Sequence, residues 1–245
     1  MAWLWRVMRP WAIPLLKLRL KVKTLQGREH IPRTGAAIIA SNHCSGLDHV
    51  VLPAMTKRVI YNISKIEHFQ SPVRGWFFKH WGVIPLDRGR GDNAALEQAK
   101  DVLRGGELFC IYPEGTRTLD GKLHKGHTGV ARLALETGAP VIPVAMLGTF
   151  EKKPKGFKGI RKEGSTGGRA GPAMTWPQLL GMQADRQTCR AVTDEIMRAI
   201  AALSGQEYVD EYTYNAVYDK DQSGAVDTPD EHAVADADPA ISHEP

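Results

Sequence analysis

Two side chains that could form a general base and its partner, His43 and Asp48, lie five residues apart. On an ideal helix five residues turn by roughly 500°, which puts two such side chains on different faces. They can meet if His43 lies on a turn and Asp48 in the following helix, and Gly46 makes such a turn easier. A carboxylate bonded to one ring nitrogen fixes the tautomer, stabilises the imidazolium and leaves the other nitrogen free as a base. The spacing alone also fits a helix-capping Asp48 and a surface His43.

Two further polar clusters, residues 87–90 (DRGR) and 113–118 (PEGTRT), carry both charge signs. The Arg117 guanidinium could hold a phosphate bidentately, and backbone amides near Gly115 could add donors. Lys65 and Arg88 offer the same chemistry, although each cation alone is more often solvated. The 113–118 cluster also fits a β-turn with a surface ion pair.

Apolar runs alternate along the chain with helix-like segments, and this alternation predicts an α/β fold. We expect a largely parallel central sheet covered by helices on both faces. Ligands bind such sheets outside the carboxyl ends of the strands, so the three clusters, which follow three strands, should share one cleft. The predicted strands are 36–40, 58–63, 83–86, 107–112 and 141–146; the predicted helices are 47–55, 66–80, 92–103, 129–136 and 187–203; residues 151–177 are predicted to be mostly loop.

The overall composition is that of a globular protein. The 245 residues are 42% hydrophobic and 24% charged, which excludes collagen-like and mostly disordered classes. Three scattered cysteines do not form a disulfide framework, and they favour a reducing compartment. No run of about 18 apolar residues predicts a membrane-spanning helix.

Charge is unevenly distributed. Residues 219–245 contain eight acids and one base, so this segment carries −7 and residues 1–218 carry +12. The acidic tail is poor in large apolar residues and is predicted to be disordered. The basic body favours a polyanionic partner such as an anionic membrane surface, phosphorylated substrates or nucleic acid.

The first 20 residues favour the membrane among these partners. They interleave Trp and Leu with four bases and no acid, a composition that suits the headgroup boundary. The charges, Pro10 and Pro14 argue against a span or a signal peptide. A core helix is the alternative, and no nucleic acid partner is expected because no RNA-binding signature or helix-turn-helix pattern is present. The expected organisation is an amphipathic membrane-associating segment (1–24), a catalytic domain (25–218) and the acidic tail (219–245).

Four ordered blocks resemble a known family. Residues 42–48 (NHCSGLD) resemble the NHxxxxD block of the glycerolipid acyltransferases, and more closely of the 1-acyl-sn-glycerol-3-phosphate acyltransferases. Residues 112–118 (YPEGTRT) resemble the FPEGTRS block, residues 82–88 (GVIPLDR) the second block, and residues 141–145 (VIPVA) the fourth. The resemblance covers about residues 25–150.

This resemblance implies a glycerolipid-acyltransferase-like fold and an acyltransferase activity in phospholipid biosynthesis. A fatty acyl group would pass from acyl-CoA or acyl carrier protein to the free hydroxyl of 1-acyl-glycerol 3-phosphate, giving phosphatidic acid. It implies no cofactor and no metal, and a peripheral location on the cytoplasmic face of the plasma membrane. Another lysolipid or glycerol 3-phosphate is the alternative acceptor.

The resemblance also implies roles for individual residues. His43 would be the base and Asp48 its partner. The substrate-binding residues would be Lys65, Arg88, Glu114, Gly115, Thr116 and Arg117. The three cations would hold the acceptor phosphate, and Glu114 would orient Arg117 or neighbouring backbone.

Four rival hypotheses remain on the residues alone. Cys44 could be a thiol nucleophile, or His43, Cys44, Asp48 and His49 could bind a metal, although their spacing matches no zinc pattern. The chain could also be a catalytically silent lipid-binding protein or a thioesterase in which water replaces the acceptor.

Overall fold

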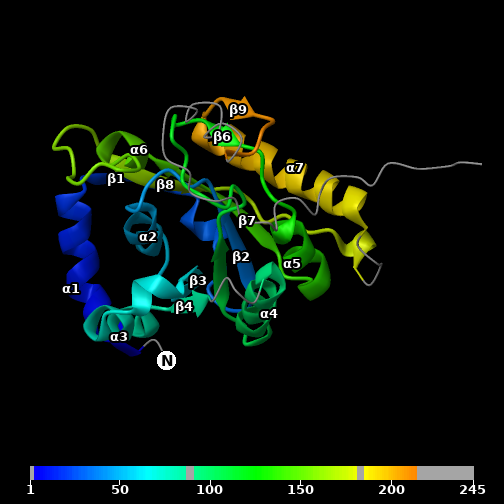
Figure 1. The fold of residues 1–245 in the computed structure, drawn as a ribbon, viewed down its shortest axis with the longest axis horizontal. Coiled ribbons are helices and arrows are strands. Elements are labelled where there is room, and N and C mark those ends of the chain that lie inside the picture. The colour runs from blue at the N-terminus through cyan, green and yellow to red at the C-terminus, as the bar shows by residue number, and fades with distance from the viewer. Residues whose placement is uncertain (1–2, 87–90, 181–184, 214–245) are drawn as a thin grey trace, which may run out of the picture.

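The computed structural model describes residues 3–86, 91–180 and 185–213, and the predicted acidic tail lies outside these ranges. The expected α/β fold is confirmed (Figure 1). Seven strands form the central sheet in the order β1–β8–β7–β2–β5–β3–β4, and among these described strands only the β7–β8 pair is antiparallel. These strands are β1 (Val22–Gln26), β2 (Ala37–Ser41), β3 (Ile60–Lys65), β4 (Val83–Leu86), β5 (Leu108–Ile111), β7 (Val141–Leu147) and β8 (Thr166–Ala170).

Helices cover both faces of this sheet (Figure 1). One apolar cluster joins the sheet to α4, α5 and α7, and a second joins the other face to α2 and the end of α1. The α-helices are α1 (Trp3–Arg19), α2 (Asp48–Val51), α3 (Pro72–His80), α4 (Gly91–Arg104), α5 (Gly129–Thr137), α6 (Thr149–Lys152) and α7 (Arg186–Ser204). Short 3₁₀ turns are η1 (Arg28–His30), η2 (Leu52–Ala54), η3 (Ile66–Phe69) and η5 (Pro177–Leu179).

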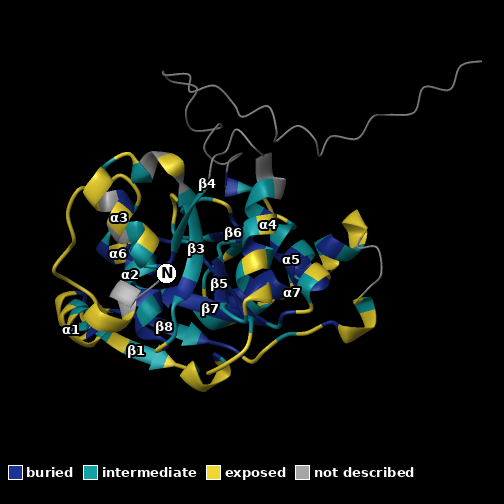
Figure 2. Ribbon diagram, turned by 90° about the horizontal axis from the view of Figure 1, so that it is seen from below, coloured by how far each residue is buried: buried dark blue, intermediate teal, exposed yellow. Residues whose placement is uncertain are grey.

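Strand β2 shows why the middle of the sheet is apolar along its whole length. All five of its residues are buried. Ile38 packs in the cluster with α4, α5 and α7, whereas Ile39 packs in the cluster on the opposite face. Successive side chains of a strand point to opposite faces, so a strand covered on both sides needs a continuous apolar run. Figure 2 shows the strands largely buried beneath more exposed helices and loops.

Pro143 lies inside β7 without breaking the sheet. Its carbonyl accepts a hydrogen bond from the backbone N–H of Gly171, so its missing N–H also faces the β8 side. Pairing with β8 begins only at the next residue, Val144, which lies opposite the last residue of β8, Ala170. The backbone N–H that Pro143 lacks would therefore lie just outside the hydrogen-bonded pairing of β7 with β8, so the sheet loses no hydrogen bond there.

The prediction that residues 151–177 are mostly loop is wrong for β8, and the sequence did not predict β1. Two glycines of β8 explain why. A Cβ on Gly167 would lie 2.5 Å from the carbonyl oxygen of Thr24 in β1, and one on Gly168 would lie 2.7 Å from the Met55 sulfur. The two glycines allow β1 and Met55 to approach β8 closely. A glycine-rich segment is nevertheless typical of a loop, which is why the strand was not predicted.

Helix α1 packs on the body while exposing apolar side chains. Ile13 and Leu20 are buried, whereas Trp11 is 82% and Leu18 is 79% exposed. The next element, β1, crosses the expected boundary at residue 24 and pairs with β8, so the helix leads directly into the central sheet. Among the described residues, no helix is long and apolar enough to cross a bilayer.

A second sheet of two strands lies apart from the central sheet. Strand β6 (Leu123–His124) pairs in parallel with β9 (Tyr208–Val209), and the two lie side by side in Figure 1. The Lys122 ammonium, just before β6, donates to the Glu207 carboxylate over 2.7 Å. The segment that follows α7 is thereby held against the segment that follows the 113–118 cluster.

Candidate active site

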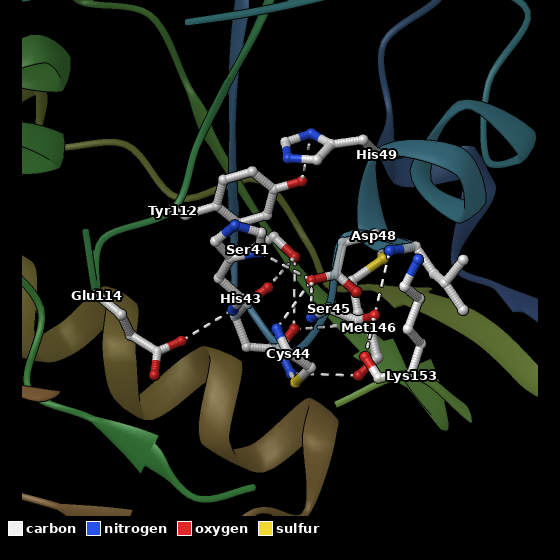
Figure 3. A network of polar contacts seen from close by, with 12 residues as sticks. Ser41, His43, Cys44, Ser45, Asp48, His49, Tyr112, Glu114, Met146 and Lys153 are labelled. Atoms are coloured by element: carbon white, nitrogen blue, oxygen red, sulfur yellow. Dashed lines mark hydrogen bonds and ion pairs between the residues drawn. The ribbon is translucent and has the colours of Figure 1, made fainter. Parts of the chain in front are cut away.

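His43 and Asp48 are brought together at the carboxyl end of β2, as the sequence predicts. His43 lies in the turn after β2, and Asp48 is the first residue of α2. The Nδ1 atom of His43 is 2.9 Å from Oδ2 of Asp48 (Figure 3). An ionised carboxylate only accepts hydrogen bonds, so Nδ1 carries the hydrogen and Nε2 is left as the basic nitrogen.

The Asp48 carboxylate is fixed by its own loop as well as by His43. Its Oδ2 atom accepts hydrogen bonds from the backbone N–H groups of Cys44 and Ser45, each over 2.8 Å. The side chain is fully buried. These bonds require the chain to wrap tightly around the carboxylate, which places His43 above it.

The imidazole ring of His43 contacts two other aromatic rings, which also contact each other. It stacks on Tyr112 with a centroid distance of 4.0 Å and an interplanar angle of 19°, and it meets the His49 ring edge-on at 5.4 Å (Figure 3). The Tyr112 hydroxyl lies 3.4 Å from Nδ1 of His49. Burial raises the pKa of Tyr112 well above its ordinary value, so its hydroxyl stays protonated. The side chain of His43 remains 13% exposed, whereas that of Asp48 is fully buried.

Glu114 binds backbone rather than facing solvent. Its Oε1 accepts from the N–H of His43 over 2.8 Å (Figure 3), and its Oε2 accepts from the N–H of His124 over 3.1 Å. Desolvation raises its pKa to about 7, against the lowering effect of the two backbone hydrogen bonds. Of the two roles expected for Glu114, orienting Arg117 or neighbouring backbone, these contacts fit the second.

Arg117 lies over the turn that carries His43. Its Nη1 atom is 3.8 Å from the position that a Cβ on Gly46 would occupy. The N–H of the next residue, Thr118, donates to the carbonyl of His43 over 2.8 Å, which ties the two segments together. Across the described part of the chain, the Arg117 guanidinium has no carboxylate partner. The cation is therefore available to an anionic group beside His43.

Four further residues were expected to bind substrate: Gly115, Thr116, Lys65 and Arg88. Gly115 adopts the left-handed conformation with φ 71°, and its N–H donates to the carbonyl of Tyr112. Thr116 Oγ1 lies 3.5 Å from Nζ of Lys155. Lys65 ends β3 at the same edge of the sheet, whereas Arg88 lies outside the described residues.

Three contacts at the site were not predicted. Ser45 donates to the carbonyl of Lys153 over 2.6 Å, so the basic 153–162 loop reaches the site. Asn42 bonds the backbone of Met146 through both ends of its amide, over 2.6 and 3.2 Å. Gln206, from beyond α7, bonds Asn42 over 2.6 Å. A basic composition could have drawn attention to the loop, but Gln206 has no local signal.

Two rival hypotheses lose support from the geometry. Cys44 is buried, and desolvation together with Asp48 and Glu114 raises the pKa of its thiol, which opposes a thiolate nucleophile. Within residues 3–86, 91–180 and 185–213, no three His, Cys, Asp or Glu side chains are grouped to hold a metal ion.

The sequence model described as Acyltransferase matches residues 23–147, and the chain belongs to this family. The narrower resemblance to the 1-acyl-sn-glycerol-3-phosphate acyltransferases is confirmed by its relatives.

Two curated relatives with that name and one solved structure of a 1-acyl-sn-glycerophosphate (LPA) acyltransferase illustrate the similarity. BAT2 of Brassica napus is 34% identical over 143 residues, which cover 57% of this chain and 41% of the relative. The Bacillus subtilis enzyme is 30% identical over 150 residues, which cover 60% of this chain and 73% of the relative. The crystal structure of PlsC from Thermotoga maritima superposes with a TM-score of 0.67 at 25% identity, covering 81% of this chain and 79% of that one. The chain thus spans well under half of the plant relative.

Proposed function

We propose that this protein transfers a fatty acyl group from a thioester donor to the free hydroxyl of 1-acyl-glycerol 3-phosphate, giving phosphatidic acid. The observation that carries the proposal is the ordered His43–Asp48 pair beside the Arg117 guanidinium. The acceptor phosphate needs a cation and the acceptor hydroxyl needs a base, and the two groups belong to one glycerol phosphate unit. A cation and a base must therefore lie close together, and Arg117 and His43 lie at the same edge of the sheet.

The reaction begins with the basic nitrogen of His43. Nε2 takes the proton of the acceptor hydroxyl while the oxygen attacks the thioester carbonyl carbon, and Asp48 stabilises the imidazolium. The tetrahedral intermediate then expels the thiolate, which receives the proton from Nε2. The new ester and the free thiol leave, and His43 returns to its neutral form without an acyl-enzyme.

The developing oxyanion needs hydrogen-bond donors. The backbone N–H groups of Gly115 and Thr118 already donate to carbonyls. Those of Thr116 and Arg117 make no backbone hydrogen bond among the described residues, so we assign them as the donors. Arg117, with Lys65 and Arg88 as expected from the family blocks, binds the acceptor phosphate.

The proposed acceptor and product are anionic lipids, so we also propose that the protein works on a membrane surface at the cytoplasmic face. Helix α1 exposes an apolar stripe at helical spacing: Val7, Trp11, Leu15 and Leu18. The 153–162 loop holds five bases and no acid, and it exposes Phe157 and Ile160. Strand β8, which follows this loop, is bonded to the residue after α1, because Thr166 Oγ1 donates to the carbonyl of Leu20 over 3.1 Å.

Thiol-release kinetics on the purified full chain test the reaction. Acyl-CoA or acyl carrier protein is offered with 1-acyl-glycerol 3-phosphate, with glycerol 3-phosphate or with no acceptor. We expect thiol release to depend on the lysolipid. Release without any acceptor would identify a thioesterase, and lipid binding without release would identify a silent lipid-binding protein.

Sedimentation with anionic vesicles tests the membrane surface. Deleting residues 1–20 would also remove the buried Ile13 and Leu20, so we choose Trp11→Gln with Leu18→Gln. This pair should reduce the bound fraction, whereas Leu180→Gln, at an exposed position beside Gly138, should not. Equal binding by all three proteins would reject the α1 surface.

A further inference from the structure

We propose that Gln206 is a positioning residue for the catalytic turn. It follows α7, beyond residues 23–147 that match the family model. The inference rests on the proposed function for its kinetic consequences, although its geometric part stands without it.

The Gln206 amide joins two segments through its two ends. Its Oε1 accepts a hydrogen bond from Nδ2 of Asn42 over 2.6 Å, and its Nε2 donates to the carbonyl of Gly121 over 2.7 Å. Nε2 also lies 3.6 Å from the Cys44 sulfur. A primary amide is suited to this place because it supplies an acceptor and a donor at once.

These contacts belong to a closed ring around His43. The N–H of Gly121 donates to Oγ1 of Thr118 over 3.1 Å, and the N–H of Thr118 donates to the carbonyl of His43 over 2.8 Å. Asn42 is the residue directly before His43 and is fully buried. Gln206 therefore holds the turn from one side through Asn42 and from the other through Gly121.

The position of Gln206 is itself set by rigid neighbours. Helix α7 ends at Ser204, and its C-cap Gly205 has a φ of 71° that lets the chain turn. The N–H of Gln206 donates to Oγ of Ser204 over 3.2 Å. Two residues later the chain enters β9, which pairs with β6. Because Gln206 is held between α7 and β9, it can fix the position of the residues that it bonds, which a residue on a free loop could not do.

Removing the amide breaks hydrogen bonds on both sides of the turn. In Gln206→Leu, Nδ2 of Asn42 loses the shortest hydrogen bond that it donates, and the carbonyl of Gly121 loses its partner. Nδ2 then keeps only the longer contacts to the Met146 carbonyl and the Cys44 sulfur, so we expect the turn to shift. A shift of about 1 Å at a catalytic base costs as much as 100-fold in rate. We expect kcat of Gln206→Leu to fall about 10- to 100-fold, with the KM for the lysolipid acceptor changed less than about twofold, since no phosphate contact is lost.

The matched control breaks a hydrogen bond made by α7 itself, the helix that precedes Gln206. Glu195 accepts from the Trp176 indole N–H over 2.8 Å, away from the turn. Glu195→Ala should lower the melting temperature and leave kcat unchanged. If Gln206→Leu lowered the melting temperature and left kcat unchanged as well, Gln206 would be merely structural and the proposal would be overturned.

Gln206→Glu provides a second variant and a pH profile. The protonated carboxyl can still accept from Asn42 and donate to Gly121, whereas the ionised form has lost the donor. Its kcat relative to the unchanged protein should therefore rise as the pH falls. A ratio that is constant with pH would count against a positioning role, even if Gln206→Leu fails to fold.

A measurement without substrate separates this inference from the proposed function. The NMR signals of the His43 ring, assigned by their loss in His43→Ala, should shift in the Gln206 variants and stay in place in Glu195→Ala. Unmoved His43 signals would overturn the inference. An inactive unchanged protein with moved signals would reject the proposed reaction and keep the positioning role.

Discussion

Among the described residues, two histidine–aspartate pairs lie on either side of the Glu114 carboxylate. His43 is paired with Asp48 in the turn after β2, and His124 of β6 is paired with Asp120. The two contacts are alike in length, 2.9 Å for the first and 3.1 Å for the second. Glu114 accepts one hydrogen bond from the backbone of each histidine.

The pairs differ in what surrounds the second ring nitrogen. His124 is 2% exposed and its Nδ1 is buried with no hydrogen-bond partner among the described residues, so nothing can reach it from solvent. The His43 side chain is 13% exposed and lies beside the Arg117 turn. We therefore propose that the first pair serves as the general base because a substrate can reach its ring and the neighbouring cation can hold that substrate, whereas a histidine–aspartate pair alone is insufficient.

The largest effect that tests this comparison is removal of each imidazole. His43→Ala should lower kcat about 1,000-fold while the fold survives, because the group that takes the hydroxyl proton is lost. His124→Ala should keep most of the activity and lose on the order of 1–3 kcal/mol of unfolding free energy, as expected for a buried polar pair. Thiol-release kinetics and urea unfolding measure both. Near-normal turnover by His43→Ala would show that the base is elsewhere.

The next effect concerns the carboxylates. Asp48→Asn should lower kcat about 100-fold or more, since an amide cannot stabilise the imidazolium and can impose the wrong tautomer. Asp120→Asn should change kcat little. Equal losses from the two variants in the same assay would remove the distinction between the pairs.

A smaller effect is expected from the cation. Arg117→Ala should raise the KM for the lysolipid acceptor about 10-fold or more and leave the donor KM unchanged, because a charge-assisted phosphate contact is lost. Arg104→Ala, on the exposed face of α4, is the control. An unchanged acceptor KM in Arg117→Ala would contradict a phosphate-binding role.

The last test concerns Glu114, which the two pairs share, and its effect is on stability rather than on rate or affinity. Its pKa is raised from 4.5 to about 7, so the folded protein binds a proton there that the unfolded chain has released. The contribution of this group to stability is therefore full below pH 4.5 and declines as the pH rises to 7, by up to roughly 3 kcal/mol. Unfolding free energies of Glu114→Gln measured between pH 4.5 and 7 should lack this slope. A slope identical to that of the unchanged protein would place the titration on another group.

Local patterns were sufficient for much of the fold. The apolar runs at β2, β5 and β7 and the helices α5 and α7 were predicted within about two residues, because parallel strands buried on both faces and amphipathic helices have strong patterns. Strands β1 and β8 were missed. Glycine in β8 reflects contact with Thr24 and Met55, which only the assembled sheet reveals.

The same division holds at the site. The order of strands and polar clusters was enough to predict that His43, Asp48 and Arg117 lie at one sheet edge. Their types and spacing left other readings open, and the family resemblance supplied the expected roles of base, partner and phosphate cation. The backbone role of Glu114, the stacking of Tyr112 on His43 and the bond from Gln206 to Asn42 were not predictable. These contacts join residues 69 to 164 positions apart, where no periodicity or local propensity carries information.

The sequence by itself determined which chemistry this protein can carry, because acids, bases and cations are properties of residue types in a recognisable order. The tertiary structure decided which of two similar histidine–aspartate pairs can use that chemistry. Access to a ring nitrogen and the orientation of a turn depend on distant segments meeting at one edge of the sheet, and that meeting exists only in the folded chain.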